Sequence, residues 1–543
     1  RAGLEILRRG GNAIDAAVAA SAMLGLTRPY DGSVGGGGFF VIYSAKTGKV
    51  TTIDSREAAP AAAGPDLFID PETGRPLSFS EARVSGLSIG VPGLVRGWEM
   101  ALAKHGSMPL SQLLRPATAV AERGFVVDAE YQRRTEQNLA MLRDFTSSRD
   151  TFLTEDGQAP QEGTVFRNSE LARTYRLLAR HGPSAFYNGE IAEAIAGAVT
   201  DPPVVPDTDR NVRAGSMTVA DLTGYRAFER ASGATTYRGL EVHGMGPPSS
   251  GATTVGNALN LLEGFDMAGV PREQALHYLI ESSALSFADR AAYLGDSDHV
   301  DVPVKGLLSQ GYADERRPLI GERAASKPTP SGDPWPYDDG SGSLVMAGDP
   351  GRADGSTTHL AVADRHGNMV SYNFTIESIA GSGIAAPGYG FLLNNELTDF
   401  SFNPDDPANA PAGSKRPRSS MSPTIVLADG KPVLAVGSPG GARIITTVLQ
   451  MLVNYVDFGM SLPEAIAAPR LSNLNGSVTA AEQGLFGAPE ADALRARGHQ
   501  LSAVGTLGNV TGVTFLSDGR MQAAAEPLRL GGGSAAVVRP SRD

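Results

Sequence analysis

The sequence predicts a fold of mixed helices and strands in which stacked β-sheets are covered by helices. Strand-like patterns occur on both sides of a segment rich in Pro, Gly, Asp and Ser, at residues 325–356, and helical patterns flank them. Hydrophobic residues make up 41% of the chain and charged residues 20%, as in ordinary globular proteins. A sheet that packs on a second sheet needs helices over its other face, so these elements fit a layered domain.

The first part of the chain is expected to alternate helices with glycine-rich turns. Residues 12–26, NAIDAAVAASAMLGL, follow the Gly10-Gly11 pair and predict a helix packed closely inside a core. The run GGFFVIYS predicts a strand, and a turn around Thr47-Gly48 leads into a second strand, KVTTIDS.

The later parts of the chain differ in pattern. Residues 94–290 carry mainly amphipathic helices, whereas tight hairpins follow the 325–356 segment. One hairpin turns at residues 364–368, and another turns at Asp429-Gly430. A Pro-Gly-Gly turn then opens a long helix. The face of this helix that is expected to be buried consists of Ile444, Ile445, Val448, Leu449, Leu452 and Val456.

The composition argues against several classes of function. A net charge of −12 and a pI near 5.3 do not favour nucleic acid or an anionic membrane as a partner. The absence of cysteine excludes a thiol nucleophile, a Cys-zinc site and a disulfide. No run of 18 apolar residues is present, so no membrane span is predicted. The eight histidines show no metal spacing such as HExxH, and neither a metal nor an organic cofactor is expected.

Two short motifs favour a structural interpretation over a catalytic one. The run GLSIG around Ser88 matches the nucleophile-elbow pattern G-x-S-x-G, but Pro92-Gly93 interrupts the helix that this motif requires. The run GSVGGGG at residues 32–38 lacks a following GK[ST] and leads into a strand, which disfavours a phosphate-binding loop. We interpret its glycines as positions where the backbone passes too close to other backbone for a side chain.

Thr357 is a candidate nucleophile. A threonine hydroxyl needs an adjacent base, and one solution is the α-amino group of the same residue at a chain N-terminus. An internal threonine reaches that state only when the peptide bond before it is cut. Residues 325–356 carry little periodicity and are expected to form a flexible, mobile linker, which would permit a cut between Ser356 and Thr357. Strand propensity also explains a Thr-Thr pair, so this pattern alone leaves both interpretations open.

Three further groups of residues suit acyl transfer on a charged, amino-acid-like ligand, although each also fits a structural role. Gly440 and Gly441 open a long helix, where free N–H groups and the helix dipole favour an anion. The carboxylates of Glu396 and Asp399, three residues apart, suit an ammonium group. An arginine fork and two hydroxyls suit a carboxylate. The residues that offer these groups are Arg56, Ser419 and Ser420.

Together and in this order, the motifs resemble the γ-glutamyltranspeptidase family along essentially the whole chain. The matching runs are GGNAIDAAVAA, GGGGFFVIY, DSREAAP, GLSIGVPG, PPSSG, TTHLAVADRHGN, GFLLNNELTDFS, SKRPRSSMSPTIV and GSPGGARIITTVLQ. The resemblance implies an α+β fold of N-terminal-nucleophile hydrolase type, a four-layer αββα sandwich made as one precursor. It also implies self-cleavage into a large subunit, residues 1–356, and a small catalytic subunit, residues 357–543, which stay interlocked as one domain.

The resemblance implies the catalytic roles as well. Thr357 becomes the nucleophile and, through its freed amine, the general base. Thr375 matches the family's second threonine, whose hydroxyl bonds to the nucleophile, and Gly440 and Gly441 match the oxyanion glycines. A γ-glutamyl amide such as glutathione acylates Thr357, and the γ-glutamyl group then passes to water, an amino acid or a peptide. This reaction needs no cofactor.

The residues matched to the donor pocket include one departure from the family. Glu377 stands where many members carry Asn, and a third carboxylate there suits a cation but disfavours an anionic ligand. The loop at residues 399–420 is shorter than the lid loop that some members carry over the site. We therefore expect an open site, a preference for hydrolysis over transfer, and a broad choice of donors. The residues matched to the donor are Arg56, Ser419 and Ser420 for its α-carboxylate, and Glu396 and Asp399 for its α-amino group.

Two other functions and two locations stay open. A same-fold amidohydrolase, either cephalosporin-acylase-like or biosynthetic, would keep Thr357 without a γ-glutamyl preference. A non-maturing binding protein would use the same pocket and keep its chain whole. Relatives are usually exported, so the resemblance implies an extracytoplasmic site, with a cytoplasmic one still open. Arg1 begins within a helical pattern, so we expect that preceding residues, and any export signal, are missing.

Overall fold

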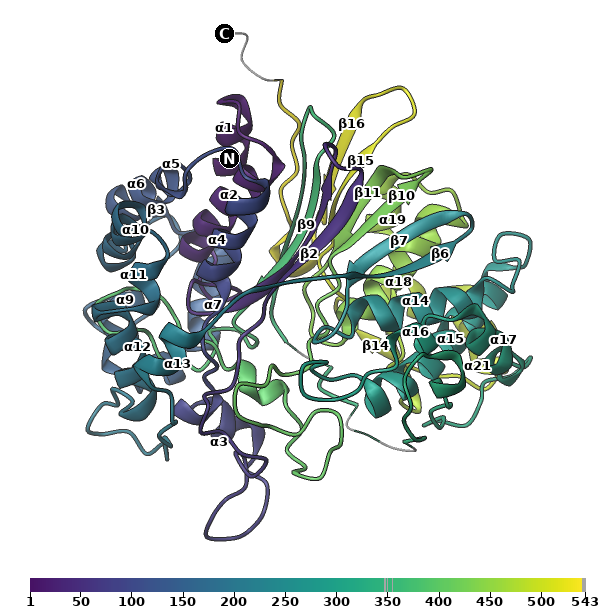
Figure 1. Cartoon of the computed structure of the whole chain (residues 1–543), viewed down its shortest axis with the longest axis horizontal. Helices are drawn as coiled ribbons and strands as arrows, with labels where there is room; N and C mark the ends of the chain where they lie inside the picture. Colours follow the sequence, from purple (N-terminus) through teal and green to yellow (C-terminus); the bar gives the residue numbers. More distant parts are fainter. Residues whose placement is uncertain (346–347, 349, 354, 540–543) are drawn as a thin grey trace.

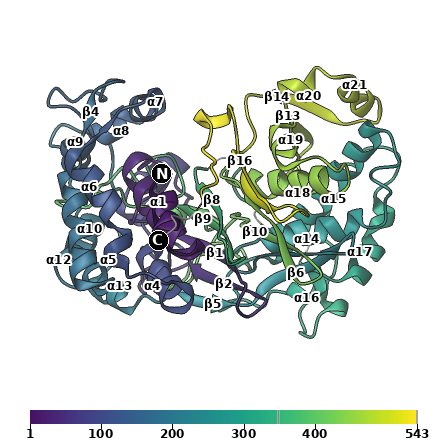
Figure 2. The ribbon, with the colours of Figure 1, turned by 90° about the horizontal axis from the view of Figure 1, so that it is seen from above.

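The computed structural model describes residues 1–345, 348, 350–353 and 355–539. Two β-sheets lie at the centre and helices cover both outer faces, which gives four layers in the order helix, sheet, sheet, helix (Figure 1). The view from above separates the two groups of helices on opposite sides of the strands (Figure 2). The predicted arrangement of stacked sheets covered by helices is confirmed.

The first sheet has five strands, each antiparallel to its neighbours. Along β1 the side chains alternate, because Phe40 and Ile42 join the core under the helices while Phe39, Val41 and Tyr43 face the second sheet. Both faces are therefore buried, which explains the continuous apolar run of this segment. In sheet order the strands are β5 (Phe228–Arg230), β2 (Lys49–Ser55), β1 (Gly37–Ser44), β9 (Met369–Thr375) and β8 (Thr358–Ala363).

The second sheet has six antiparallel strands and packs face to face on the first. Each sheet combines strands from before and after the 325–356 segment. In sheet order the strands are β16 (Met521–Ala525), β15 (Thr511–Phe515), β11 (Lys431–Gly437), β10 (Thr424–Ala428), β7 (Leu240–Met245) and β6 (Ser232–Tyr237).

The inner helices of each outer layer agree with the predicted patterns. Helices α2 (Ala13–Thr27) and α4 (Leu94–His105) pack on the first sheet, and α14 (Gly251–Leu262) and α18 (Arg443–Val456) pack on the second. The predicted face of α18 is buried, except that Val456 is half-buried. Further helices complete the layers. They include α6 (Arg115–Arg123), α7 (Ala129–Gln137), α10 (Ser169–His181) and α12 (Glu190–Thr200) beside the first sheet, and α15 (Arg272–Tyr293), α17 (Gln310–Arg316), α19 (Leu462–Ala467) and α21 (Pro489–Ala496) beside the second.

The prediction of mainly helices over residues 94–290 missed five strands. Two of them, β3 (Phe125–Val126) and β4 (Val165–Phe166), form a short separate pair, and β5, β6 and β7 belong to the two central sheets. Strands β6 and β7 form a hairpin whose two turn residues, Arg238 and Gly239, have φ values of 50° and 78°. This conformation matches the right-handed twist of a two-residue hairpin, and Arg is an unusual residue for it. The residues of this turn therefore gave little indication of a hairpin in the sequence.

The interpretation of the glycine run before β1 is confirmed. A Cβ atom on Gly36 would lie 1.9 Å from the carbonyl oxygen of Thr375, and one on Gly38 would lie 2.3 Å from that of Asn373. Ser88 lies in a short 3-10 helix, and its hydroxyl donates to the carbonyl oxygens of Arg83 and Ser85. Its role in the structure is to close a turn.

The described part of the 325–356 segment begins with several anchors. Lys327 Nζ donates to Glu281 Oε1 at 2.5 Å, and Thr329 Oγ1 donates to Asn475 Oδ1 at 2.9 Å. Trp335 then packs with neighbouring residues against the C-terminal end of α15. The mobility of the segment stays a prediction. Within the described ranges, none of the helices combines the length and the apolar character that crossing a bilayer requires.

Candidate active site

A cavity of about 640 Å³ lies beside the start of β8. This volume is in the range of small-molecule sites. All of the predicted site residues except Gly440 line the cavity, and Gly440 directly precedes the lining residue Gly441. The structure therefore brings the predicted site residues together. The predicted residues that line the cavity are Arg56, Ser356, Thr357, Thr375, Glu377, Glu396, Asp399, Ser419, Ser420 and Gly441.

Two hydroxyl groups donate hydrogen bonds to the carbonyl oxygen of the peptide bond between Ser356 and Thr357. Thr357 Oγ1 donates to the carbonyl oxygen of Ser356 at 2.5 Å and lies 3.4 Å from Thr375 Oγ1. Thr375 Oγ1 donates to the same carbonyl oxygen at 2.8 Å and accepts the N–H of Glu377 at 2.8 Å. Ser356 and Thr357 are 6% and 7% exposed. A polarised carbonyl and a hydroxyl in contact, shielded from water, are the starting arrangement for an acyl shift.

Strand pairing sets the positions of the two threonines. Thr357 directly precedes β8, and Thr375 ends the neighbouring strand β9. On its other side Thr375 pairs with Gly37 of β1. The close approach of Gly36 to the Thr375 carbonyl fixes this end of β9 against the preceding turn.

The turn between β11 and α18 faces the residues that precede the Ser356–Thr357 bond. Its glycines, Gly440 and Gly441, have φ values of +134° and +59°. A Cβ atom on Gly355 would lie 3.1 Å from Gly441 Cα, and Ala442 donates its N–H to the Arg352 carbonyl at 3.2 Å. No acceptor in the described part of the chain takes the N–H of Gly440 or Gly441. Two such amides at a helix start suit an anion.

Arg56, which is predicted to bind a carboxylate, pairs with Glu396 and Asp399, which are predicted to bind an ammonium group. It follows β2, while Glu396 and Asp399 lie on a 3-10 helix, η4 (Glu396–Asp399). The Arg56 guanidinium forms ion pairs with Glu396 and, at 2.5 Å, with Asp399, and it lies 4.0 Å from Glu57. Burial lowers the pKa of Arg56, but the charges of these three carboxylates outweigh burial and raise it. The Arg56 guanidinium therefore stays protonated, and the neighbouring acidic groups already balance its charge.

Glu377 adds a further buried carboxyl group to the cavity. It adopts a φ of +73°, which is unusual for a residue other than glycine, and its Oε2 accepts from Ser378 Oγ and Asn395 Nδ2 at 2.5 Å each. Burial, together with the nearby charge of Asp399, raises the pKa of Glu377 from 4.5 to about 7. Burial also raises the pKa of Glu57 to about 7 and the pKa of Glu396 well above its usual value. Glu377 therefore titrates near neutral pH, in a cavity that arginines also line.

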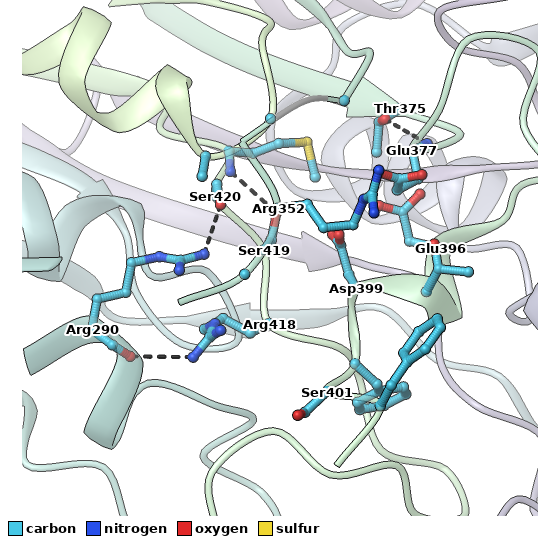
Figure 3. Close-up of a pocket in the computed structure, with 18 of the residues that line it drawn as sticks. Arg290, Arg352, Thr375, Glu377, Glu396, Asp399, Ser401, Arg418, Ser419 and Ser420 are labelled. Carbon is cyan, nitrogen blue, oxygen red and sulfur yellow. Dashed lines mark hydrogen bonds between the residues drawn. The ribbon is translucent and has the colours of Figure 1, made fainter. Parts of the chain in front are cut away.

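Arginines that the sequence had not indicated complete the lining. Arg290 of α15 donates to Ser420 Oγ at 2.8 Å (Figure 3). It also donates to Ser250 Oγ at 2.9 Å. Arg352 comes from the segment before Thr357, and Figure 3 shows its side chain extending toward Glu377. In the sequence, Arg290 is one of several charged residues on this helix, and nothing in the pattern marked it as a residue of the cavity.

Among the described residues, a cluster of possible metal ligands lies away from the cavity, where two residues of α15 meet His499. His277 and Glu281 are one turn apart, and His499 completes a buried trio whose ligand atoms lie within 4.8 Å of one another. His277 Nδ1 lies 2.8 Å from His499 Nε2, and the carboxylate of Glu281 is paired with Lys327 at 2.5 Å. An ammonium on the carboxylate and a hydrogen bond between the rings explain the cluster as a satisfied polar network. The histidine spacing in the sequence gave no sign of it.

Comparisons with known proteins identify the family. A family model for Gamma-glutamyltranspeptidase matches residues 1–536. The chain belongs to this family. The Glutathione hydrolase proenzyme of Bacillus subtilis (strain 168) is 41% identical over 479 residues, which cover 86% of this chain and 78% of that protein. The Acylase ACY 1 proenzyme of Pseudomonas sp. (strain V22) is 35% identical over 553 residues, which cover 98% and 92%. The crystal structure of the cephalosporin acylase from Bacillus halodurans matches with a TM-score of 0.86 at 28% identity, over 99% of this chain and 94% of that one.

Family membership confirms two expectations. The protein is an enzyme of the γ-glutamyltranspeptidase family, and its αββα architecture is that of the N-terminal-nucleophile hydrolases. The relatives include proteins named for glutathione hydrolysis and proteins named as acylases. The donor that this chain uses is therefore a separate question.

Proposed function

We propose that the chain cuts itself between Ser356 and Thr357 and that the product is a γ-glutamyl hydrolase and transferase with Thr357 as its nucleophile. The observation that carries this proposal is the hydrogen bond from Thr357 Oγ1 to the Ser356 carbonyl oxygen, which Thr375 also binds. The word proenzyme in the names of the relatives agrees with a precursor that is processed.

Self-cleavage is proposed to begin with an acyl shift. Thr357 Oγ1 attacks the carbonyl carbon of Ser356, and Thr375 Oγ1 stabilises the oxyanion from 2.8 Å. The hydroxyl proton moves to the Thr357 nitrogen as the C–N bond breaks, which leaves an ester between Ser356 and Thr357. Water hydrolyses this ester into a Ser356 carboxylate and a restored hydroxyl. Thr357 then carries a free amine beside its own nucleophile.

A cut at this bond is expected to leave one interlocked body of two fragments, residues 1–356 and 357–543. Strands β1 and β2 of the first fragment share a sheet with β8 and β9 of the second. The second sheet likewise joins β6 and β7 to four strands of the second fragment. Separating the fragments would break ladders in both sheets, so the fragments should copurify.

In the proposed catalytic cycle, the mature enzyme repeats the acyl chemistry on a donor. The Thr357 amine takes the hydroxyl proton, Oγ1 attacks the γ-carbonyl of a γ-glutamyl amide, and the amides of Gly440 and Gly441 stabilise the oxyanion. The proton then goes to the leaving amine. Water or the amino group of an acceptor resolves the ester. No metal or organic cofactor takes part in these steps.

Donor recognition is proposed to use the paired charges of the cavity. The α-carboxylate of the donor would bind at Arg56, Ser419 and Ser420, and its α-ammonium would bind at Glu396 and Asp399. Arg56 now pairs with Glu396 and Asp399. A zwitterionic donor would offer a carboxylate to Arg56 and an ammonium group to the two acidic residues. The amino acid enters without leaving a buried charge unpaired.

A same-fold amidohydrolase without γ-glutamyl preference is the second candidate. The observation that favours it is Glu377, a third carboxyl group in the cavity with a pKa of about 7. In its charged form Glu377 would repel the donor carboxylate. The similarity to acylases fits the same alternative.

Intact mass of the purified wild type and of Thr357→Ala, before and after incubation, tests the self-cleavage. We expect two fragments, which end at Ser356 and begin at Thr357, in the wild type and one chain in the variant. Ser88→Ala is the matched control, and it should cleave like the wild type. An uncut wild-type chain would reject the proposal and favour the non-maturing binding protein.

The donor is tested with two anilides that differ by one group. γ-Glutamyl p-nitroanilide carries the α-ammonium group that glutaryl p-nitroanilide lacks. We expect kcat/KM for the γ-glutamyl compound to be at least about 100-fold higher, because a site with buried polar groups rejects an analogue that leaves them unpaired. Equal values would support the amidohydrolase.

A further inference from the structure

The side chain of Ser356 has its own binding site in the uncut chain. Ser356 Oγ donates a hydrogen bond to Asp31 Oδ1. Asp31 lies in the loop between α2 and β1, and the two residues are 325 positions apart in the chain. The contact therefore joins the residue before the proposed cut to the loop that connects the first helical layer to β1.

Asp31 is itself fixed by a buried arginine. Arg134 of α7 lies 3.2 Å from Asp31, and the two side chains are 7% and 14% exposed. Arg134 Nε also donates to Glu130 Oε1 at 2.7 Å, one turn away on the same helix. A carboxylate held by a guanidinium on a packed helix has little rotational freedom, and it accepts a stronger hydrogen bond than a neutral group does.

This contact completes three constraints on Ser356. Its N–H donates to the Glu377 carbonyl at 2.6 Å, and its carbonyl oxygen accepts from Thr357 and Thr375. The side-chain contact with Asp31 restrains the residue at a third point. Three restraints in different directions define the orientation of the carbonyl group relative to Thr357 Oγ1, and attack requires such alignment.

We propose that Asp31, held by Arg134, is a positioning residue for self-cleavage and acts through the hydroxyl of Ser356. This inference rests on the proposed cut between Ser356 and Thr357. Asp31 makes no contact with the reacting atoms, so its effect is on the fraction of chains whose carbonyl group is aligned for attack.

The experiment follows the rate at which freshly purified full-length chain converts into two fragments. The variants are Asp31→Ala, Asp31→Asn, Ser356→Ala and the double variant Asp31→Ala/Ser356→Ala. Asp31→Ala is expected to mature roughly 10- to 100-fold more slowly, because a misplaced reacting group costs about this much. Asp31→Asn keeps a hydrogen-bond acceptor without the charge, so its rate should fall between those of the wild type and Asp31→Ala.

The double variant separates positioning from a loss of structure. If Asp31 acts through Ser356, each single variant is slow and the double variant is no slower than the slower single one. The matched control is Arg28→Gln, which removes the 2.8 Å ion pair between Arg28 and Asp128. That pair ties the end of α2 to the start of α7 but does not touch Ser356. Arg28→Gln should mature at the wild-type rate.

Three results would overturn the inference while leaving the proposed function intact. These are an Asp31→Ala rate within about twofold of the wild type, a double variant whose slowing equals the product of the two single effects, or an equal slowing in Arg28→Gln. An uncut wild-type chain would instead reject the proposed cleavage itself. The two failures are therefore distinguishable in one set of measurements.

Discussion

Two glycine-rich turns approach the threonine pair, and they use glycine for opposite reasons. In the first turn, which passes into β1 along residues 35–38, a Cβ atom on Gly36 would overlap the Thr375 carbonyl oxygen at 1.9 Å. In the turn before α18, the nearest atom to a Cβ on Gly440 would be 3.6 Å away, which is ordinary contact, but the φ of +134° is one that other residues rarely adopt. The first turn needs space, and the second needs a backbone conformation.

The two turns also lead into different elements, β1 in the first case and α18 in the second. The first glycine run holds β1 against β9 and so supports the position of Thr375. The second presents two amides that no described group accepts from, beside the segment that precedes Thr357. Substitution in the first turn should therefore damage the fold, whereas substitution in the second should damage the chemistry. The following predictions test this distinction, from the largest expected effect to the smallest.

Gly36→Ala should have the largest effect. Its methyl group would overlap both the Thr375 carbonyl oxygen and, at 2.8 Å, Ile376 Cγ2, so β1 and β9 must separate. We expect a loss of unfolding free energy of more than roughly 4 kcal/mol and little soluble, cleaved protein. Circular dichroism and denaturant unfolding measure this. A folded variant that matures normally would contradict the structural role of the turn.

Gly440→Ala should leave the protein folded and slow the reaction. The strained φ costs about 1–3 kcal/mol of stability, and a displaced oxyanion amide costs roughly 10²–10³ in kcat. The measurement is kcat per fully cleaved molecule with γ-glutamyl p-nitroanilide, alongside the thermal midpoint. If kcat stays at the wild-type value, the amide of Gly440 has no part in the chemistry.

The first turn also predicts a pH dependence of stability, because Gly37 leaves room for the buried carboxyl of Glu57. A Cβ on Gly37 would lie 2.5 Å from Glu57 Oε2. Burial raises the pKa of Glu57 from 4.5 to about 7, so between these values the folded state binds more protons than the unfolded state. The contribution of this group is present below pH 4.5 and is lost as pH rises through 7.

Glu57→Gln tests this linkage in the uncut Thr357→Ala background, where the covalent state is constant. The decrease in unfolding free energy from pH 5 to pH 8 should be about 2.5 kcal/mol smaller in the variant than in its parent, at 1.36 kcal/mol for each unit of pKa. Denaturant unfolding at both pH values measures it. An unchanged pH dependence would show that Glu57 does not hold its proton in the folded protein.

Gly430→Ala should have the smallest effect and serves as the control for both turns. Gly430 has a φ of +71° at a hairpin tip, and a Cβ there would meet nothing within 4 Å. We expect a cost of about 1 kcal/mol in unfolding free energy with normal maturation and kcat. A loss of activity in this variant would mean that backbone strain alone, anywhere in the sheets, disturbs the site.

Most of the fold was predictable where a single strong local pattern specified an element. The helix at residues 12–26 appears as Ala13–Thr27 with Asn12 as its N-cap, and the hairpin at Asp429-Gly430 forms as expected. The hairpin of β6 and β7 was missed, because its turn uses Arg238 in a left-handed conformation. Among the site residues, those in ordered family motifs were found together. Arg290 was missed because one charge on a long helix carries no sign of where it points.

By itself the sequence determined the period of each strand and helix, the places where a side chain is absent, and the kinds of chemical group available for acyl transfer. These properties depend on residues that are close together in the sequence, so they can be recognised without knowledge of the fold. Only the tertiary structure decided which atoms crowd each glycine, which carboxyls have a pKa near 7, and that Asp31 meets Ser356 across 325 positions. Such properties arise from burial and from contacts between distant segments, because desolvation and close packing exist only after the chain has folded.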